Sequence, residues 1–153
     1  MSEEATHHDV FTVERTYRAA PERVFDAWAD PAKKRRWFAE GEGWTIESFE
    51  LDFREGGLER TRFRFGDGPP MTNDTVFHDI VANRRVVYSY GMTMSGKRFS
   101  VSLATLVLER AGSGTRMRYT EQIVLFGQGR EAVEQRRLGC GELLERLAAE
   151  LGE

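Results

Sequence analysis

Two glutamates of this chain stand where its apolar pattern predicts buried side chains. Glu59 is in phase with Phe63 and Phe65 in a strand pattern, so these residues share one face, and Glu121 is in phase with Tyr119 in the same way. When burial pushes the pKa values of two carboxyl groups apart, one can donate a proton and the other can accept one. An ion pair with arginine, or a position at the rim of a cavity, explains the same pattern without catalysis. The pattern therefore predicts either an acid–base pair or two structural carboxylates.

Other side chains that could carry out chemistry are few. Tyr88 and Tyr90 are in phase with each other and could offer hydroxyl groups to a bound polar molecule. His78 is the only histidine within the predicted folded region, and Cys140 is the only cysteine. A nucleophilic Cys–His pair is one interpretation, but a packing role for the thiol is simpler. No CxxC or HxxxH spacing occurs, so we expect no metal or other cofactor.

Two short motifs have a structural explanation. The basic run Lys33-Lys34-Arg35-Arg36 lies beside Trp37 and Phe38, which could indicate nucleic acid or an acidic partner. Because the chain has a formal net charge of −3, we expect a solvated helix face and no nucleic acid. Gly127-Gln128-Gly129 lacks the rest of the glycine-rich phosphate-binding fingerprint. We interpret it as a hinge.

Length and composition indicate one domain with room for an internal cavity. The chain has 153 residues, of which 40% are hydrophobic and 31% are charged. We expect residues 10–153 to form the domain and residues 1–9, with His7 and His8, to form a flexible tail. No apolar stretch approaches the roughly 18 residues of a membrane span, and the acidic start lacks the features of a secretory signal. These features predict a cytoplasmic protein without an internal disulfide.

The periodicity of apolar residues predicts strands first and a long helix last. A strand at 10–18 precedes short helical segments opened by Pro21 and by Asp30-Pro31. About six further strands, mostly antiparallel, are expected at 44–53, 58–65, 73–81, 85–92, 98–109 and 115–125. In the strand at 58–65, every second residue is arginine, so the face that carries Glu59 and Phe63 should be buried.

The final segment, 128–151, has the period of an amphipathic helix. Its C-terminal half is rich in leucine and should hold the helix against the sheet. Gly139 and Gly141 weaken its N-terminal half, which predicts a looser space below that half. One stripe of this helix should face the sheet, and it contains Val133, Arg137, Cys140, Leu144, Leu147 and Leu151.

Several motifs resemble those of one family. They are Ala20-Pro21 with Val24-Phe25, Trp28 and Asp30-Pro31; Asp52-x-Arg54-x-Gly56-Gly57; Arg85-Val86-Val87-Tyr88; and Leu143-Leu144-Glu145-Arg146-Leu147. They resemble the homologues of the activator of heat-shock-protein ATPase, within the START-like (SRPBCC) superfamily. The resemblance implies an α+β helix-grip (Bet v-like) fold, in which a curved antiparallel sheet of about seven strands wraps around a long C-terminal helix. Two short helices should follow the first strand. The family usually has Gly-Trp where this chain has Gly139-Cys140, which implies extra open volume.

These observations predict a carrier or sensor that binds a small hydrophobic or amphipathic molecule, such as a lipid, between the helix and the sheet. A cofactor-independent enzyme that acts in the same cavity is the alternative. The resemblance also implies a modulator of a chaperone ATPase, with a role in stress response, as a further alternative. The protein should be a monomer or a homodimer without a membrane span. The predicted ligand-binding residues are Glu59, Phe63, Phe65, Phe77, Tyr88, Tyr90, Val101, Leu103, Met117, Tyr119, Glu121, Val133, Arg137 and Cys140.

Overall fold

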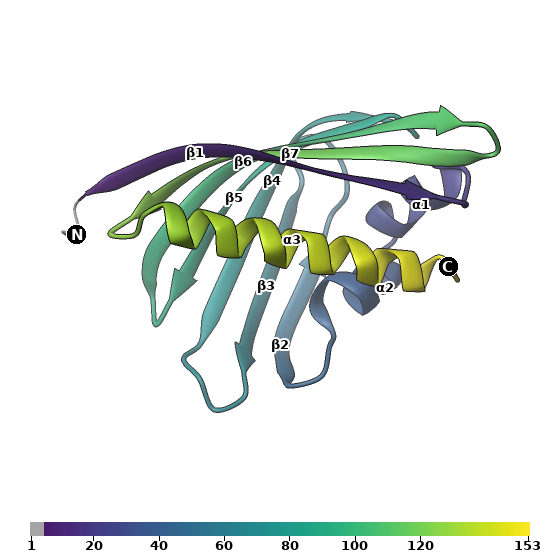
Figure 1. Ribbon diagram of the computed structural model, residues 1–153. Coiled ribbons are helices and arrows are strands. Elements are labelled where there is room, and N and C mark those ends of the chain that lie inside the picture. The colour runs from purple at the N-terminus through teal and green to yellow at the C-terminus, as the bar shows by residue number, and fades with distance from the viewer. Residues whose placement is uncertain (1–4) are drawn as a thin grey trace.

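A computed structural model describes residues 5–153 and shows a curved antiparallel sheet wrapped around one long helix (Figure 1). The seven strands lie in the order β1-β7-β6-β5-β4-β3-β2. The elements are β1 (Thr6–Tyr17), α1 (Pro21–Ala29), α2 (Pro31–Lys34), the π-helical turn η1 (Arg35–Ala39), β2 (Trp44–Leu51), β3 (Leu58–Phe65), β4 (Met71–Val81), β5 (Arg85–Met94), β6 (Lys97–Ala111), β7 (Gly114–Phe126) and α3 (Arg130–Glu150). The predicted helix-grip fold is confirmed.

The first strand is longer than the sequence pattern predicted. Thr6 pairs with Phe126, and the ladder between β1 and β7 continues without interruption to Tyr17. Residues 6–9 therefore belong to the sheet, and the predicted tail at 1–9 was too long. The pattern missed them because polar residues dominate this stretch, whose register comes from pairing with β7. Residues 1–4 of that predicted tail lie outside the described residues.

The segment after α1 changes its helical period. Asp30 caps α2 by accepting a hydrogen bond from the backbone N–H of Lys33, and the chain then enters the π-turn η1. A π-turn adds a residue to the turn, so side chains no longer follow the 100° spacing of an α-helix. The prediction of a wholly solvated basic face is wrong for Lys34, whose side chain is 3% exposed. Arg36 does lie at the surface, where it pairs with Glu150.

The Asp-x-Arg-x-Gly-Gly motif forms the tight connection between β2 and β3. Gly57 donates to the carbonyl of Arg54 and accepts from the backbone N–H of Phe77. A Cβ at Gly57 would lie 2.0 Å from the carbonyl oxygen of Asp52, so only glycine fits there. The motif thus fixes the start of β3, and with it the face on which Glu59 lies.

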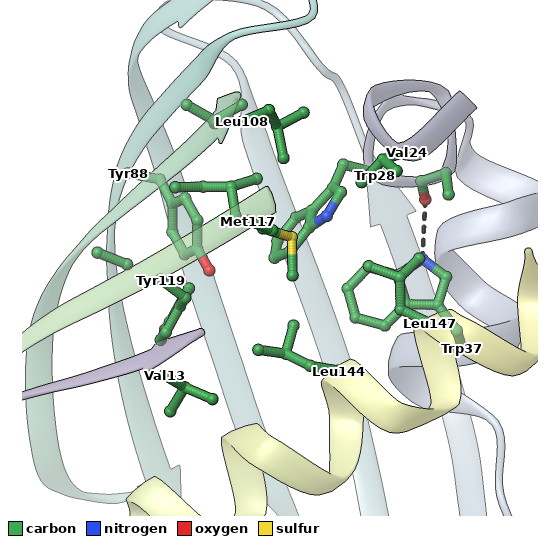
Figure 2. Close-up of a cluster of buried hydrophobic side chains, with 14 of the residues drawn as sticks. Val13, Val24, Trp28, Trp37, Tyr88, Leu108, Met117, Tyr119, Leu144 and Leu147 are labelled. Atoms are coloured by element: carbon green, nitrogen blue, oxygen red, sulfur yellow. Dashed lines mark hydrogen bonds between the residues drawn. The ribbon is translucent and has the colours of Figure 1, made fainter. Parts of the chain in front are cut away.

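The core lies between the C-terminal half of α3, the inner face of the sheet and α1 (Figure 2). Leu144 and Leu147 of α3 are buried with Met117 of β7, as the leucine-rich pattern predicted. The hydroxyl of Tyr17 donates to the carbonyl of Leu144 and ties β1 to the helix. These contacts fix this half of α3 against the sheet. No helix within residues 5–153 is long and apolar enough to cross a membrane.

Candidate functional site

A cavity of about 630 Å³ lies between α3 and the inner face of the sheet. This volume is within the range of about 300–1,000 Å³ that is typical of small-molecule sites. Aromatic and methionine side chains make up much of its wall: Trp28, Trp37, Phe38, Trp44, Phe63, Phe77, Tyr88, Tyr90, Phe99, Tyr119, Met71, Met92 and Met94. Fewer polar groups interrupt this wall, among them Lys34, Glu59, Thr61 and Arg136.

Half of the predicted ligand-binding residues line this cavity, and the others lie elsewhere. Those in its wall are Glu59, Phe63, Phe77, Tyr88, Tyr90, Tyr119 and Cys140. Met117 and Val133 are buried in the hydrophobic core. Phe65 is 56% exposed at the end of β3, where its ring packs 4.8 Å from that of Trp44. It follows the predicted alternation, but the strand ends beyond the cavity.

The prediction for β6 was wrong in its choice of face. Leu103 is 39% exposed and Val101 is half-buried, whereas Ser100 and Ser102 face inward and are buried. The pattern was ambiguous because apolar residues occur on both faces of this strand. Small polar residues belong inside here because Ser102 donates to the buried carboxylate of Glu121. Val101 and Leu103 are therefore not ligand-binding candidates.

The arginine that faces the cavity from α3 is Arg136, not the predicted Arg137. The guanidinium of Arg137 pairs with Glu134 at the surface. Arg136 points toward the sheet and donates to the hydroxyl oxygens of Tyr90 at 2.9 Å and Ser100 at 2.8 Å. Because neighbouring residues of a helix differ by 100°, an error of one position moves the charge out of the site.

Glu121 is the centre of a buried polar network just behind the cavity wall. It is fully buried and accepts from the hydroxyls of Tyr90 at 2.7 Å, Ser102 at 2.6 Å and Tyr119 at 2.6 Å. Arg136 lies 3.4 Å from the same carboxylate. Burial, followed by the charge of Glu121, raises the pKa of Tyr90 well above its ordinary value, so this phenol remains a donor. The network satisfies the carboxylate and joins α3 to three strands.

The second buried carboxylate, Glu59, pairs with the buried Lys34. The Nζ of Lys34 donates to Oε1 of Glu59 at 2.9 Å, and both side chains are 3% exposed. The ammonium also lies 4.8 Å from the ring centroid of Trp28 and 4.6 Å from that of Phe38. Ring faces attract a cation, so they stabilise the charge in this dry position. The alternation of β3 predicted the buried position of Glu59. The sequence did not indicate its partner, because Lys34 lies within a run of four basic residues that is typical of a solvated face.

Cys140 lies in the cavity wall with its Sγ 3.7 Å from Oε1 of Glu121. Burial, reinforced by the charge of Glu121, raises the pKa of the thiol. We therefore expect the folded protein to react with iodoacetamide at pH 8 at least about tenfold more slowly than the unfolded chain, whose thiol has an ordinary pKa of about 8.5. Because the pKa is raised, the rate should increase only at more alkaline pH. Mass spectrometry of the single adduct measures both rates, and equal rates would contradict the buried position.

Residues 5–153 contain no group of three or more His, Cys, Asp or Glu side chains arranged to hold a metal ion.

The fold and the cavity define a helix-grip protein with an internal cavity. The chain matches the family described as "Activator of Hsp90 ATPase homolog 1-like protein" over residues 18–152, and it belongs to this family. No curated protein matches it significantly.

Solved structures agree with this assignment. A protein from Rhizobium loti is 45% identical, with 95% of this chain and 99% of that chain covered and a TM-score of 0.87. An uncharacterised protein from Rhizobium leguminosarum is 36% identical, with 97% of each chain covered and a TM-score of 0.91. An AHSA1 protein from Silicibacter pomeroyi shares the fold, with 22% identity, coverage of 94% and 98%, and a TM-score of 0.75.

Proposed function

We propose that this protein binds a small hydrophobic or amphipathic molecule in the cavity under α3, as a carrier or sensor. The observation that carries the proposal is the aromatic and methionine-rich wall around about 630 Å³. Such a wall gains free energy when an apolar molecule replaces water, and methionine adapts to varied shapes. The polar groups in the wall can orient the ligand.

The two carboxylates have structural partners, which favours binding over catalysis. Glu121 is satisfied by three hydroxyl groups, and Glu59 forms an ion pair with Lys34. The family description refers to activation of the Hsp90 ATPase. Ligand binding in the cavity does not require such a partner, and a ligand-dependent contact with a chaperone would extend this function.

A cavity-filling variant tests the proposal. Nile red, a neutral hydrophobic dye, should bind the folded protein near one equivalent, and its fluorescence should increase. Cys140→Trp should lower its affinity by about tenfold or more, since the ring occupies ligand space, and change stability by about 1–3 kcal/mol. Fluorescence titration measures the affinity, and native mass spectrometry of purified protein identifies any molecule already bound.

Leu138→Trp is the matched control. Leu138 is 53% exposed on the same helix and does not line the cavity, so the added ring should leave dye affinity unchanged. If the wild-type protein binds no dye while circular dichroism shows an intact fold, the proposed function is wrong. Equal dye affinity in wild type and Cys140→Trp would place the binding site elsewhere.

A further inference from the structure

Two residues that line the cavity each carry a buried polar atom without a hydrogen-bond partner among the described residues. The atoms are the indole Nε1 of Trp28 and the hydroxyl Oγ1 of Thr61. Both side chains are 3% exposed, and both residues line the cavity. Burying a polar group without a partner costs about 1–3 kcal/mol, so most buried groups of this kind are satisfied. By comparison, the indole N–H of Trp37 donates to the carbonyl of Ala27 at 2.8 Å (Figure 2).

The two unsatisfied groups belong to one polar end of the cavity. Thr61 lies two residues from Glu59 on the same face of β3, a separation of roughly 6.5–7 Å along the strand. Glu59 holds Lys34, whose ammonium lies over the Trp28 ring. We call these four residues, Trp28, Lys34, Glu59 and Thr61, the polar end of the cavity. Aromatic rings surround it on the side of α1 and η1.

The charges at the polar end disfavour a charged head group at this end of the cavity. Lys34 and Glu59 neutralise each other, and the Glu59 carboxylate has one hydrogen bond in the described part of the chain. A ligand carboxylate would meet the negative charge of the nearly inaccessible Glu59 side chain, and burying an uncompensated ion is unfavourable. A ligand ammonium would compete with Lys34 and would leave the indole N–H without an acceptor.

We infer that the ligand is a neutral amphiphile whose hydroxyl or carbonyl group binds at the polar end of the cavity. A ligand oxygen would accept from the Thr61 hydroxyl, which turns toward the cavity by rotation about χ1, or from the indole N–H after a small shift of the Trp28 ring. A ligand hydroxyl could also donate to Glu59. The apolar part then fills the aromatic cavity. This inference rests on the proposed function and specifies the class of ligand.

The test compares three probes of equal chain length: decanol, decane and decanoate, each in competition with Nile red. In the wild-type protein, decanol should bind more tightly than decane and decanoate. Thr61→Val replaces the hydroxyl by a methyl group of nearly the same size. It should weaken decanol binding by about three- to tenfold, the effect of one hydrogen bond, and leave decane binding unchanged. The thermal midpoint of the free protein should stay equal or rise, because an unsatisfied hydroxyl is removed.

Thr105→Val is the matched control. Thr105 lies between Ala104 and Leu106, which face the core, and therefore lies on the outer face of β6. This change should affect none of the three affinities. Trp28→Phe removes the other unsatisfied donor and should also weaken decanol more than decane.

Each outcome has one meaning. If decanoate binds more tightly than decanol, or if Thr61→Val weakens decanol and decane equally, the inference is wrong and the proposed function stands. If neither the dye nor any of the three probes binds, the proposed function itself is wrong. Selective loss of decanol affinity in Thr61→Val supports the neutral head group.

Discussion

Lys34→Met should destabilise the protein by about 3–5 kcal/mol, because it leaves the Glu59 carboxylate buried without its counter-ion. The Lys34–Glu59 contact is 2.9 Å and both side chains are almost inaccessible. Replacing both partners removes the uncompensated charge, so Lys34→Met/Glu59→Leu should recover most of the lost stability. Urea unfolding followed by circular dichroism measures the free energy of unfolding of each variant.

The neighbouring lysine provides the control for this experiment. Lys33 forms an exposed ion pair with Asp26, and exposed pairs contribute little to stability. The free energy of unfolding of Lys33→Met should therefore be close to that of the wild-type protein. A Lys34→Met variant as stable as Lys33→Met would show that the Lys34 side chain is solvated. A Lys34→Met/Glu59→Leu variant no more stable than Lys34→Met would show that the unpaired Glu59 carboxylate does not cause the loss of stability.

Glu121→Leu should have an effect of similar size, about 3–5 kcal/mol, for a different reason. The change removes the acceptor shared by the hydroxyls of Tyr90, Ser102 and Tyr119, and it leaves Arg136 without its carboxylate. Three buried donors then lose their partner at once. Glu121→Gln keeps one acceptor oxygen and should lose less. Urea unfolding of the two variants gives the comparison.

A surface carboxylate offers the matched comparison for Glu121. Glu14 on β1 accepts hydrogen bonds from Arg116 and Arg118 in an exposed position. Glu14→Gln should leave the unfolding midpoint nearly unchanged, since water replaces the lost contacts. If Glu121→Leu matched wild type in stability, the network would be no better than apolar packing, and its contribution to holding α3 in place would be refuted.

Much of the fold follows from periodicity in the sequence. The alternation in β3 places Glu59 and Phe63 on the buried face, and the leucine spacing of α3 predicts its contact with the sheet. These predictions succeed because one face of each element is clearly more apolar than the other. The family motifs add the order of the elements, which periodicity alone does not give.

The candidate site was harder to predict because its polar groups are exceptions to the apolar pattern. The inner face of β6 carries Ser100 and Ser102 because the buried network needs small polar partners, although the outer face looks more apolar. Lys34 ends α2 and faces inward, where its partner is Glu59 of β3. Both features depend on residues distant in sequence, Glu121 and Glu59, so no local pattern contains them.

The tryptophans around the cavity allow ligand entry to be followed without a label. The chain has three tryptophans, and Trp28, Trp37 and Trp44 all line the cavity. With excitation that selects tryptophan over the four tyrosines, its emission therefore arises from indoles around this space, without a background from tryptophans elsewhere. A molecule that enters should alter the intensity or wavelength of that emission directly. Unlabelled compound libraries can thus be screened by intrinsic fluorescence alone.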